Sequence, residues 1–186
     1  MAEHVCPWWI GYFLISPIRR WLQDPEELIK PYITPGMIVL EPGPGMGFFT
    51  LPLARRVGSG RVVAVDIQPK MLNALRRRAE KAGLLQRIDV RLAKSDSLGI
   101  DDLRGTVDFA VAVAVVHEMP SASAFFRQVA AALKLGGRLL FAEPAGHVKP
   151  EFFERELDAA REAGLIEENR LEIKCFQAAL LVKRAQ

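Results

Sequence analysis

Three closely spaced glycines, Gly43, Gly45 and Gly47, lie where a short apolar run gives way to a helical pattern. Glycines at such a junction permit positive φ and let a ligand approach the backbone, and the first turn of the following helix offers unpaired N–H groups. Asp66 ends the next apolar run, where an acidic side chain can accept hydrogen bonds from the hydroxyls of a ribose. Together the two features indicate a ligand that contains adenosine.

The residues around these glycines discriminate between adenosine ligands. A dinucleotide fingerprint needs glycine at its first, third and sixth positions, but the sixth position counted from Gly43 is Phe48. Glu41, which precedes the glycines, would also repel the pyrophosphate of a dinucleotide. A carboxylate there suits a cationic ligand, such as the ammonium or sulfonium group of S-adenosylmethionine. The alternative is a tight strand-to-helix turn that binds nothing, which would make Glu41 and Asp66 coincidental.

Two further groups of polar residues follow later apolar runs. His117 and Glu118 come after the run 107–114, and Glu143 comes directly after the run 138–142. An imidazole titrates near pH ~6.5, so His117, with Glu118 beside it, is the candidate for removing a proton from a nucleophile. The alternatives are that His117 packs beside the ligand and that Glu118 favours the start of the next helix. Glu143 is expected either to orient the substrate or to cap local N–H groups.

The elements that would position these residues alternate between short apolar runs and amphipathic segments. Strands that are nearly continuous in apolar residues, separated by helices, predict a parallel α/β sheet covered by helices on both faces. The last two runs, 166–173 and 175–182, are too closely connected for a crossover helix, and they predict an antiparallel hairpin at one edge. The other strands are expected at 37–41, 61–66, 88–92, 107–114 and 138–142, and the helices at 17–32, 48–57, 70–82, 122–135 and 150–163.

Length and composition exclude several classes of protein. A chain of 186 residues, half of them hydrophobic and a quarter charged, is expected to form one domain that folds alone. A formal net charge of +3 is too small for binding dominated by nucleic-acid phosphates, and the basic run Arg76, Arg77 and Arg78 is expected on the wet face of a helix. Cys6 and Cys175 have no zinc-ligand spacing, and no apolar stretch is long enough to span a membrane. These features predict a cytoplasmic protein with reduced thiols and no metal.

In combination these segments resemble the class I S-adenosylmethionine-dependent methyltransferases, particularly the small single-domain group known as methyltransferase type 11 or type 25. The family motifs are matched by VLEPGPGMGFFTLPLA, VVAVDIQPKML, AKSDS, VDFAVAVAVVHEMP and LKLGGRLLFAEP, and the likeness covers roughly residues 37–182. It implies a Rossmann-like, seven-stranded and mostly parallel sheet of order 3-2-1-4-5-7-6, with strand 7 antiparallel.

The resemblance also implies a set of cofactor contacts. Asp66 would bind the ribose, and Asp96, with Ser97 beside it, would bind the adenine amino group. The cofactor would be S-adenosylmethionine, the product S-adenosylhomocysteine, and no metal would take part. The complete set of cofactor contacts is Glu41, Gly43, Pro44, Gly45, Gly47, Asp66, Ile67, Met71, Ser95, Asp96, Ser97 and Ala114.

The expected function is methyl transfer to an unidentified small molecule. A sulfonium methyl group is already activated, so an enzyme can act mainly by aligning the reactants, which supplies on the order of 7 to 11 kcal/mol. Two alternatives remain: a non-catalytic regulator that binds S-adenosylmethionine, and an RNA methyltransferase. The ribosomal RNA adenine dimethylases carry Asn or Asp, then Pro and an aromatic residue, after the fourth strand. This chain instead has Ala114, Val115, Val116 and His117, so a nucleic-acid partner is not favoured.

The substrate side is expected to involve the first 36 residues. Relatives often insert segments near the last strands, and this chain has almost no room for them. A lid must therefore come from an aromatic and helical segment, 1–36, or from another subunit of a homodimer, while 37–186 forms the cofactor-binding domain. Trp8, Trp9 and Tyr12 are candidate substrate contacts, together with Glu143; the alternative is that the aromatic residues only cap the core.

Overall fold

The computed structural model describes residues 24–185, which form one sheet with helices packed against it. The strands are β1 (Ile38–Pro42), β2 (Arg61–Asp66), β3 (Ile88–Leu92), β4 (Val107–Val113), β5 (Leu133–Pro144), β6 (Leu165–Ile173) and β7 (Phe176–Lys183). The α-helices are α3 (Pro25–Ile29), α4 (Thr50–Arg56), α5 (Pro69–Lys81), α6 (Ala122–Ala132) and α7 (Pro150–Glu162). Three short 3₁₀ turns, η1 (Leu85–Arg87), η2 (Asp101–Leu103) and η3 (Val116–Glu118), complete the described part of the chain.

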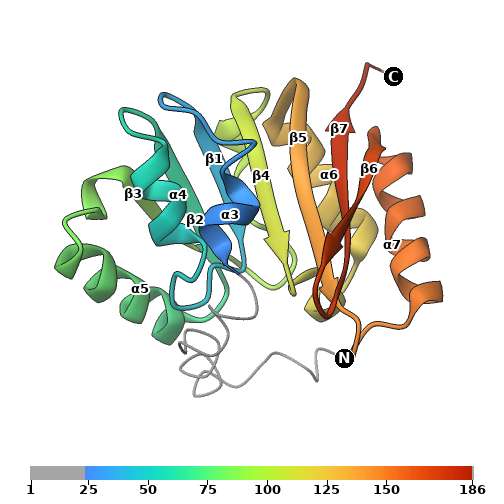
Figure 1. Cartoon of the computed structure of the whole chain (residues 1–186), viewed down its shortest axis with the longest axis horizontal. Coiled ribbons are helices and arrows are strands. Elements are labelled where there is room, and N and C mark those ends of the chain that lie inside the picture. Colours follow the sequence, from blue (N-terminus) through green and yellow to red (C-terminus); the bar gives the residue numbers. More distant parts are fainter. Residues whose placement is uncertain (1–23, 186) are drawn as a thin grey trace.

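The seven strands pair in the order β3-β2-β1-β4-β5-β7-β6 (Figure 1). The pairs from β3 to β5 are parallel, whereas β7 runs antiparallel to both β5 and β6. The predicted strand order, the antiparallel seventh strand and the terminal hairpin are therefore confirmed. The order reverses direction between β1 and β4, and ligands of open α/β sheets bind outside the carboxyl ends of strands at such a point.

Both faces of the sheet are buried, which explains the nearly continuous apolar strands. Neighbouring residues on one strand belong to different cores: Val39 faces the cluster with α3, α4 and α5, and Leu40 faces the cluster with α6 and α7. Phe126 of α6 and Phe153 of α7 both pack against Phe141 of β5, with ring centroids 5.3 and 5.1 Å away. Within residues 24–185, no helix is long and apolar enough to cross a membrane.

Two predicted helices end differently in the structure. The helix expected at 122–135 stops at Ala132, because Leu133 adopts an extended conformation and pairs with Val107 as the first residue of β5. Of the helix expected at 17–32, the described part is α3 alone, which Asp24 caps by accepting a hydrogen bond from the Glu26 N–H at 2.9 Å. The rest of that prediction, and most of the proposed lid segment 1–36, lies outside the described residues.

Candidate active site

The chain between β1 and α4 forms a glycine bend, here residues 43–47. Gly43, Gly45 and Gly47 have φ values of +68°, +54° and +88°, which favour glycine. A Cβ atom on Gly43 would lie 2.5 Å from Cγ2 of Val115, and one on Gly47 would lie 2.5 Å from Cδ1 of Leu75. A Cβ atom on Gly45 would meet nothing within 4 Å. The bend therefore packs closely at both ends and faces open space in the middle.

Asp66, at the end of β2, is hydrogen-bonded to the glycine bend. One carboxylate oxygen accepts from the Gly45 N–H at 3.2 Å, and the other accepts from the Gln68 N–H at 2.8 Å. The residue is only 8% exposed, and burial raises the pKa of its carboxyl group. The structure thus brings together the glycine bend after β1 and the acidic residue at the end of β2, which the sequence analysis linked to one ligand.

Glu41, on β1, is a buried carboxylate with an unsatisfied oxygen. The residue is 3% exposed, and neither its Oε2 atom nor the hydroxyl of Thr50 has a hydrogen-bond partner among the described residues. Burial raises the pKa of the Glu41 carboxyl group to about 8; the polar groups of nearby Thr50 partly offset the rise, and the charge of Asp66 adds to it. Buried polar atoms are normally paired, so this oxygen is a vacant acceptor beside the glycine bend. A cationic group would satisfy it.

The other predicted cofactor contacts differ in how accessible they are. Ile67 is 42% exposed after β2, while Pro44 and Met71 are buried, and Met71 packs on Met46 beside the bend. Ala114 follows β4 with a φ of +57°, a strained value for a residue with a side chain. Strain of this kind persists where surrounding structure enforces it, and here the Ala114 N–H donates to the Ala142 carbonyl at 2.8 Å.

The loop 95–99, which carries three predicted cofactor contacts, is anchored to α6. Ser95 and Asp96 are exposed, and Ser97 is half-buried. Oε1 of Gln128 accepts a hydrogen bond from the Leu98 N–H at 2.8 Å, and the Ser97 hydroxyl lies 3.5 Å from the same oxygen. Gln128 of α6 therefore anchors the loop that carries Asp96.

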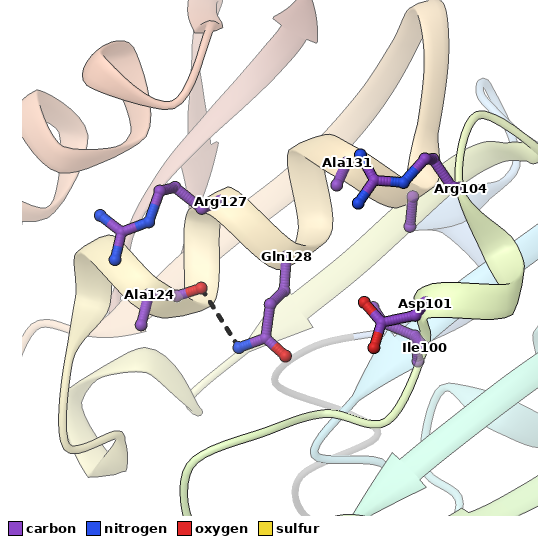
Figure 2. A pocket seen from close by; sticks show the side chains of 8 residues that line it. Ile100, Asp101, Arg104, Ala124, Arg127, Gln128 and Ala131 are labelled. Atoms are coloured by element: carbon purple, nitrogen blue, oxygen red, sulfur yellow. Dashed lines mark hydrogen bonds between the residues drawn. The ribbon is translucent and has the colours of Figure 1, made fainter.

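Gln128 also lines a cavity of about 270 Å³ between α6 and η2 (Figure 2). Its amide nitrogen donates to the Ala124 carbonyl at 3.2 Å, which fixes the orientation of the side chain. The glycine bend does not line this cavity. The cavity is related to the site only through Gln128, which supports the loop 95–99.

His117 is joined to Glu143 across the carboxyl ends of β4 and β5. The Nδ1 atom of His117 lies 2.5 Å from Oε2 of Glu143, and the other carboxylate oxygen accepts from the Val116 N–H at 2.7 Å and the His117 N–H at 3.3 Å. The Glu143 side chain is fully buried, and that of His117 is 27% exposed. Glu143 therefore caps local N–H groups, as one of the two sequence interpretations expected. Its complete burial favours that role over contact with a substrate.

Several titratable groups surround this pair. Glu118 Oε1 lies 3.9 Å from Nε2 of His117, and the ring of His147 is nearly parallel to that of His117 with centroids 6.5 Å apart. Glu156 of α7 has a buried oxygen without a partner among the described residues, and burial, with the charge of Glu143, raises its pKa to about 7. Burial alone would lower the pKa of His117, but the hydrogen bond and charge of Glu143 outweigh it, so the pKa is raised.

Three contributors to the site were not identified from the sequence. Arg78, expected on a wet helix face with Arg76 and Arg77, instead turns inward and donates to the Met46 carbonyl of the glycine bend. Gln128 and Glu156 carry no motif, because each acts through a contact between elements that are distant in the sequence. The predicted substrate contacts Trp8, Trp9 and Tyr12 lie outside the described residues. No group of three or more His, Cys, Asp and Glu within residues 24–185 is arranged to hold a metal ion.

The chain is similar in sequence to known methyltransferases. A family model described as a methyltransferase domain matches residues 39–137. The ribosomal protein L11 methyltransferase of Symbiobacterium thermophilum is 36% identical over 121 residues, which cover 65% of this chain and 34% of that protein. The ubiquinone biosynthesis O-methyltransferase of Methylocella silvestris is 33% identical over 118 residues, which cover 63% of this chain and 43% of that protein. The chain spans less than half the length of these relatives.

A solved structure resembles the chain over nearly its whole length. The crystal structure of a SAM dependent methyltransferase from Aquifex aeolicus superposes with a TM-score of 0.82 at 26% sequence identity. The match covers 96% of this chain and 100% of that chain. The likeness therefore includes the terminal hairpin, which lies beyond the residues matched by the family model.

Proposed function

The chain belongs to the methyltransferase domain family, and from that premise we propose that it transfers a methyl group from S-adenosylmethionine to a small molecule. When bound, S-adenosylmethionine supplies an activated methyl group on a positively charged sulfur. The protein's own part is then to bind both reactants, align them and exclude water. The description of the Aquifex aeolicus structure as a SAM dependent methyltransferase supports this choice of cofactor.

The observation that carries the proposal is the vacant, buried oxygen of Glu41. A structural turn would not leave a carboxylate oxygen buried and unpaired, because such a group costs about 1–3 kcal/mol. A cationic ligand compensates that cost and lowers the carboxyl pKa again, whereas a dinucleotide pyrophosphate would add to the repulsion. The cost in the free protein is thus consistent with a site built for a positively charged ligand.

The residues beside Glu41 fit the rest of an adenosine cofactor. Gly45 leaves open space on the bend, where a backbone without a side chain can lie against a ligand. Asp66 would bind the ribose hydroxyls from the end of β2, and Asp96 would bind the adenine from the exposed loop 95–99. These assignments rest on the family resemblance and on position: Gly45, Asp66 and Asp96 lie at or after the carboxyl ends of β1, β2 and β3.

The catalytic side of the proposal involves His117 and Glu118. Both lie on η3, directly after β4, at the carboxyl edge of the sheet where ligands of this fold class bind. His117 would accept a proton from the acceptor, and its exposed fraction of 27% leaves the ring accessible. Glu118 would place a negative charge near the imidazolium that results. The aromatic residues Trp8, Trp9 and Tyr12 would cover the acceptor.

A second candidate acceptor is a protein side chain. The relative with 36% identity is named for methylation of a ribosomal protein, whereas the one with 33% identity is named for O-methylation in ubiquinone biosynthesis. We favour a small acceptor because the mild charge of the chain offers no strong field for a ribosomal partner.

The test is an assay of S-adenosylhomocysteine release. The purified chain is incubated with S-adenosylmethionine and a panel of phenols, amines, thiols and a ribosomal protein fraction, and products are identified by mass spectrometry. We expect methylated product from a small molecule, and at least about 10-fold less from Asp66→Asn, which loses charged hydrogen bonds to the ribose. Methylation of the ribosomal fraction alone would overturn the small-molecule proposal. Cofactor binding without product from any acceptor would favour the regulatory alternative instead.

A further inference from the structure

We propose that Glu143 is a positioning residue that fixes His117 as a general base with Nε2 directed to the acceptor, and that the acceptor therefore carries a hydroxyl group. The inference rests on the proposed methyl transfer and adds to it the class of acceptor. Glu143 lies on β5 and His117 on η3, so the pair joins two elements that are distant in the sequence.

Glu143 is held so firmly that it can act as an orienting group. It is fully buried, and one of its oxygens accepts hydrogen bonds from two consecutive backbone N–H groups, those of Val116 and His117. Its other oxygen lies 2.5 Å from Nδ1 of His117. The carboxylate is thereby tied to the same turn that carries the imidazole, which fixes both the ring angle and the distance.

This contact selects one tautomer of His117. An ionised carboxylate only accepts hydrogen bonds, so Nδ1 of His117 must be the protonated nitrogen that donates to Glu143. In the neutral ring, Nε2 then carries the lone pair. Nε2 lies 3.9 Å from Oε1 of Glu118, beyond hydrogen-bonding distance, and the side chain is partly exposed. The ring therefore presents a proton acceptor rather than a donor to the carboxyl edge of the sheet.

The groups that face His117 from each neighbouring element favour its protonated form. Glu118 lies beside it on η3, Glu143 on β5 and Glu156 on α7, while His147, from the segment after β5, faces the ring with its own imidazole. The carboxylates stabilise the imidazolium that forms when the ring takes up a proton. His147, when charged, opposes them.

A base of this kind is needed most by a hydroxyl group. A neutral amine already has a lone pair, and a thiol ionises near pH ~8.5, whereas a phenol such as that of tyrosine ionises only near pH ~10. In the proposed step the acceptor O–H bond breaks and its proton passes to Nε2 of His117. The oxygen forms the new bond to the methyl carbon, and the electron pair of the broken carbon–sulfur bond stays on the sulfur. Charge and atoms then balance without any further reactant.

The positioning role is tested first on the free protein. ¹⁵N NMR of the imidazole groups, assigned with His117→Gln, should show Nδ1 protonated and Nε2 unprotonated in neutral His117. In Glu143→Gln the pKa of His117 should fall, because burial then acts without the compensating carboxylate, and the preference for this tautomer should weaken. A His117 tautomer and pKa that are the same in both proteins would overturn the positioning role. Thermal unfolding confirms that the variants are folded.

Kinetics then separates positioning from a merely structural effect. With a phenolic acceptor, kcat should rise with pH as His117 loses its proton, and in Glu143→Gln this rise should move to lower pH while kcat falls by about 10- to 100-fold. KM for the acceptor should change little, and Glu143→Asp should recover part of the loss. Glu151→Gln, an exposed change on α7, is the matched control. A lower kcat with an unshifted pH profile would contradict the inference.

The acceptor class is tested with 2-naphthol, 2-naphthylamine and 2-naphthalenethiol, which share one ring system. The expected result is an O-methyl product from naphthol that depends on His117. Transfer to the amine or thiol but not to naphthol overturns the hydroxyl class while leaving the proposed methyl transfer intact. Failure of calorimetry to detect S-adenosylhomocysteine binding, by contrast, refutes the proposed function itself.

Discussion

Gly43 and Gly47 lack side chains because the fold leaves no room for them, but Gly45 has a different reason. Its φ of +54° favours glycine, and a Cβ atom there would enter open space. The free protein therefore needs glycine at 45 only for its backbone angle. A ligand lying against the bend would need it for space as well.

Gly45→Ala separates these two needs. The left-handed backbone angle should cost about 1 kcal/mol of unfolding free energy, whereas the added methyl group should weaken S-adenosylhomocysteine binding by more than about 10-fold. Gly83→Ala is the matched control, because Gly83 has a φ of +68°, also faces open space, and ends α5 rather than the site. Chemical denaturation and calorimetry measure the two effects. Equal affinity in both variants would show that no ligand lies against Gly45.

The buried carboxyl group of Glu41 lowers the stability of the folded chain as the pH rises. Its folded-state pKa of about 8 lies above the ordinary value of 4.5, so the folded chain holds a proton that the unfolded chain releases. Stability is therefore lost as the pH rises from about 4.5 to about 8. The proposed binding of a cationic ligand beside the glycine bend would account for this cost, because the ligand would stabilise the negative charge.

Glu41→Gln should remove the pH-dependent loss of stability, because glutamine does not ionise. At pH 8 the variant should be more stable than the parent chain by on the order of 4 kcal/mol, and the difference should disappear below pH 4, where the parent carboxyl is protonated in both states. Denaturant unfolding across this pH range measures the difference. A constant difference at all pH values would contradict the buried titration. Glu151→Gln, which is exposed, should show almost no change at any pH.

At the scale of elements, α6 supports the loop 95–99, which carries three of the proposed cofactor contacts. Gln128 is the link, because it accepts from Leu98 and bonds back to its own helix through Ala124. The loop 95–99 has no regular secondary structure apart from the short bridge between Lys94 and Ser97. Gln128 anchors the loop to α6, and Arg91 on β3 anchors it from the other end by donating to the Gly99 carbonyl at 3.4 Å.

Gln128→Ala should loosen the loop without touching the ligand. We expect S-adenosylhomocysteine affinity to fall by roughly 3- to 10-fold, as ordering the loop then becomes part of the cost of binding, and Tm to change by only a few degrees. Arg127→Ala is the control: Arg127 is the preceding residue of the same helix and lines the same cavity, and within residues 24–185 no hydrogen bond joins its side chain to the loop. If both variants bind equally well, α6 does not position the loop.

The elements that could be predicted are those with a local signal. The apolar runs predicted β1 to β4 and the hairpin of β6 and β7 to within a residue or two, and the amphipathic pattern predicted α5 and α7 to within one residue at each end. The end of α6 could not be predicted, because residues 133–135 are apolar or helix-compatible and only pairing with Val107 draws Leu133 into β5. Tertiary pairing there overrides local preference.

The same distinction holds for the site. The glycine bend, Glu41 and Asp66 could be predicted because each has a motif and ends a strand. Glu143 was identified, but its bond to His117 was not, since the sequence does not show that the turn after β4 faces the end of β5. Gln128, Arg78 and Glu156 act from helices whose contacts with these loops appear only in the folded chain.

For the whole molecule, the topology explains why the carboxylates and the histidine lie at the same edge of the sheet. Glu41, Asp66, His117 and Glu143 lie at or just after the carboxyl ends of β1, β2, β4 and β5, around the point where the strand order reverses. These four strands are neighbours in the sheet (Figure 1). The terminal hairpin lies on the β5 side of the sheet, away from the glycine bend. The proposed contacts Glu41, Asp66 and Asp96 thus lie at or after the ends of β1, β2 and β3, whereas the proposed base lies on the turn after β4.

The central claim is that this carboxylate-flanked bend binds a positively charged sulfur nucleoside. Isothermal titration of the purified chain with S-adenosylmethionine, S-adenosylhomocysteine and NAD tests it directly. The account predicts saturable, one-to-one binding of the first two, weakened by more than about 10-fold in Glu41→Gln and Asp66→Asn, and much weaker binding of NAD. Tighter binding of NAD, or no heat with either sulfur nucleoside, would contradict it.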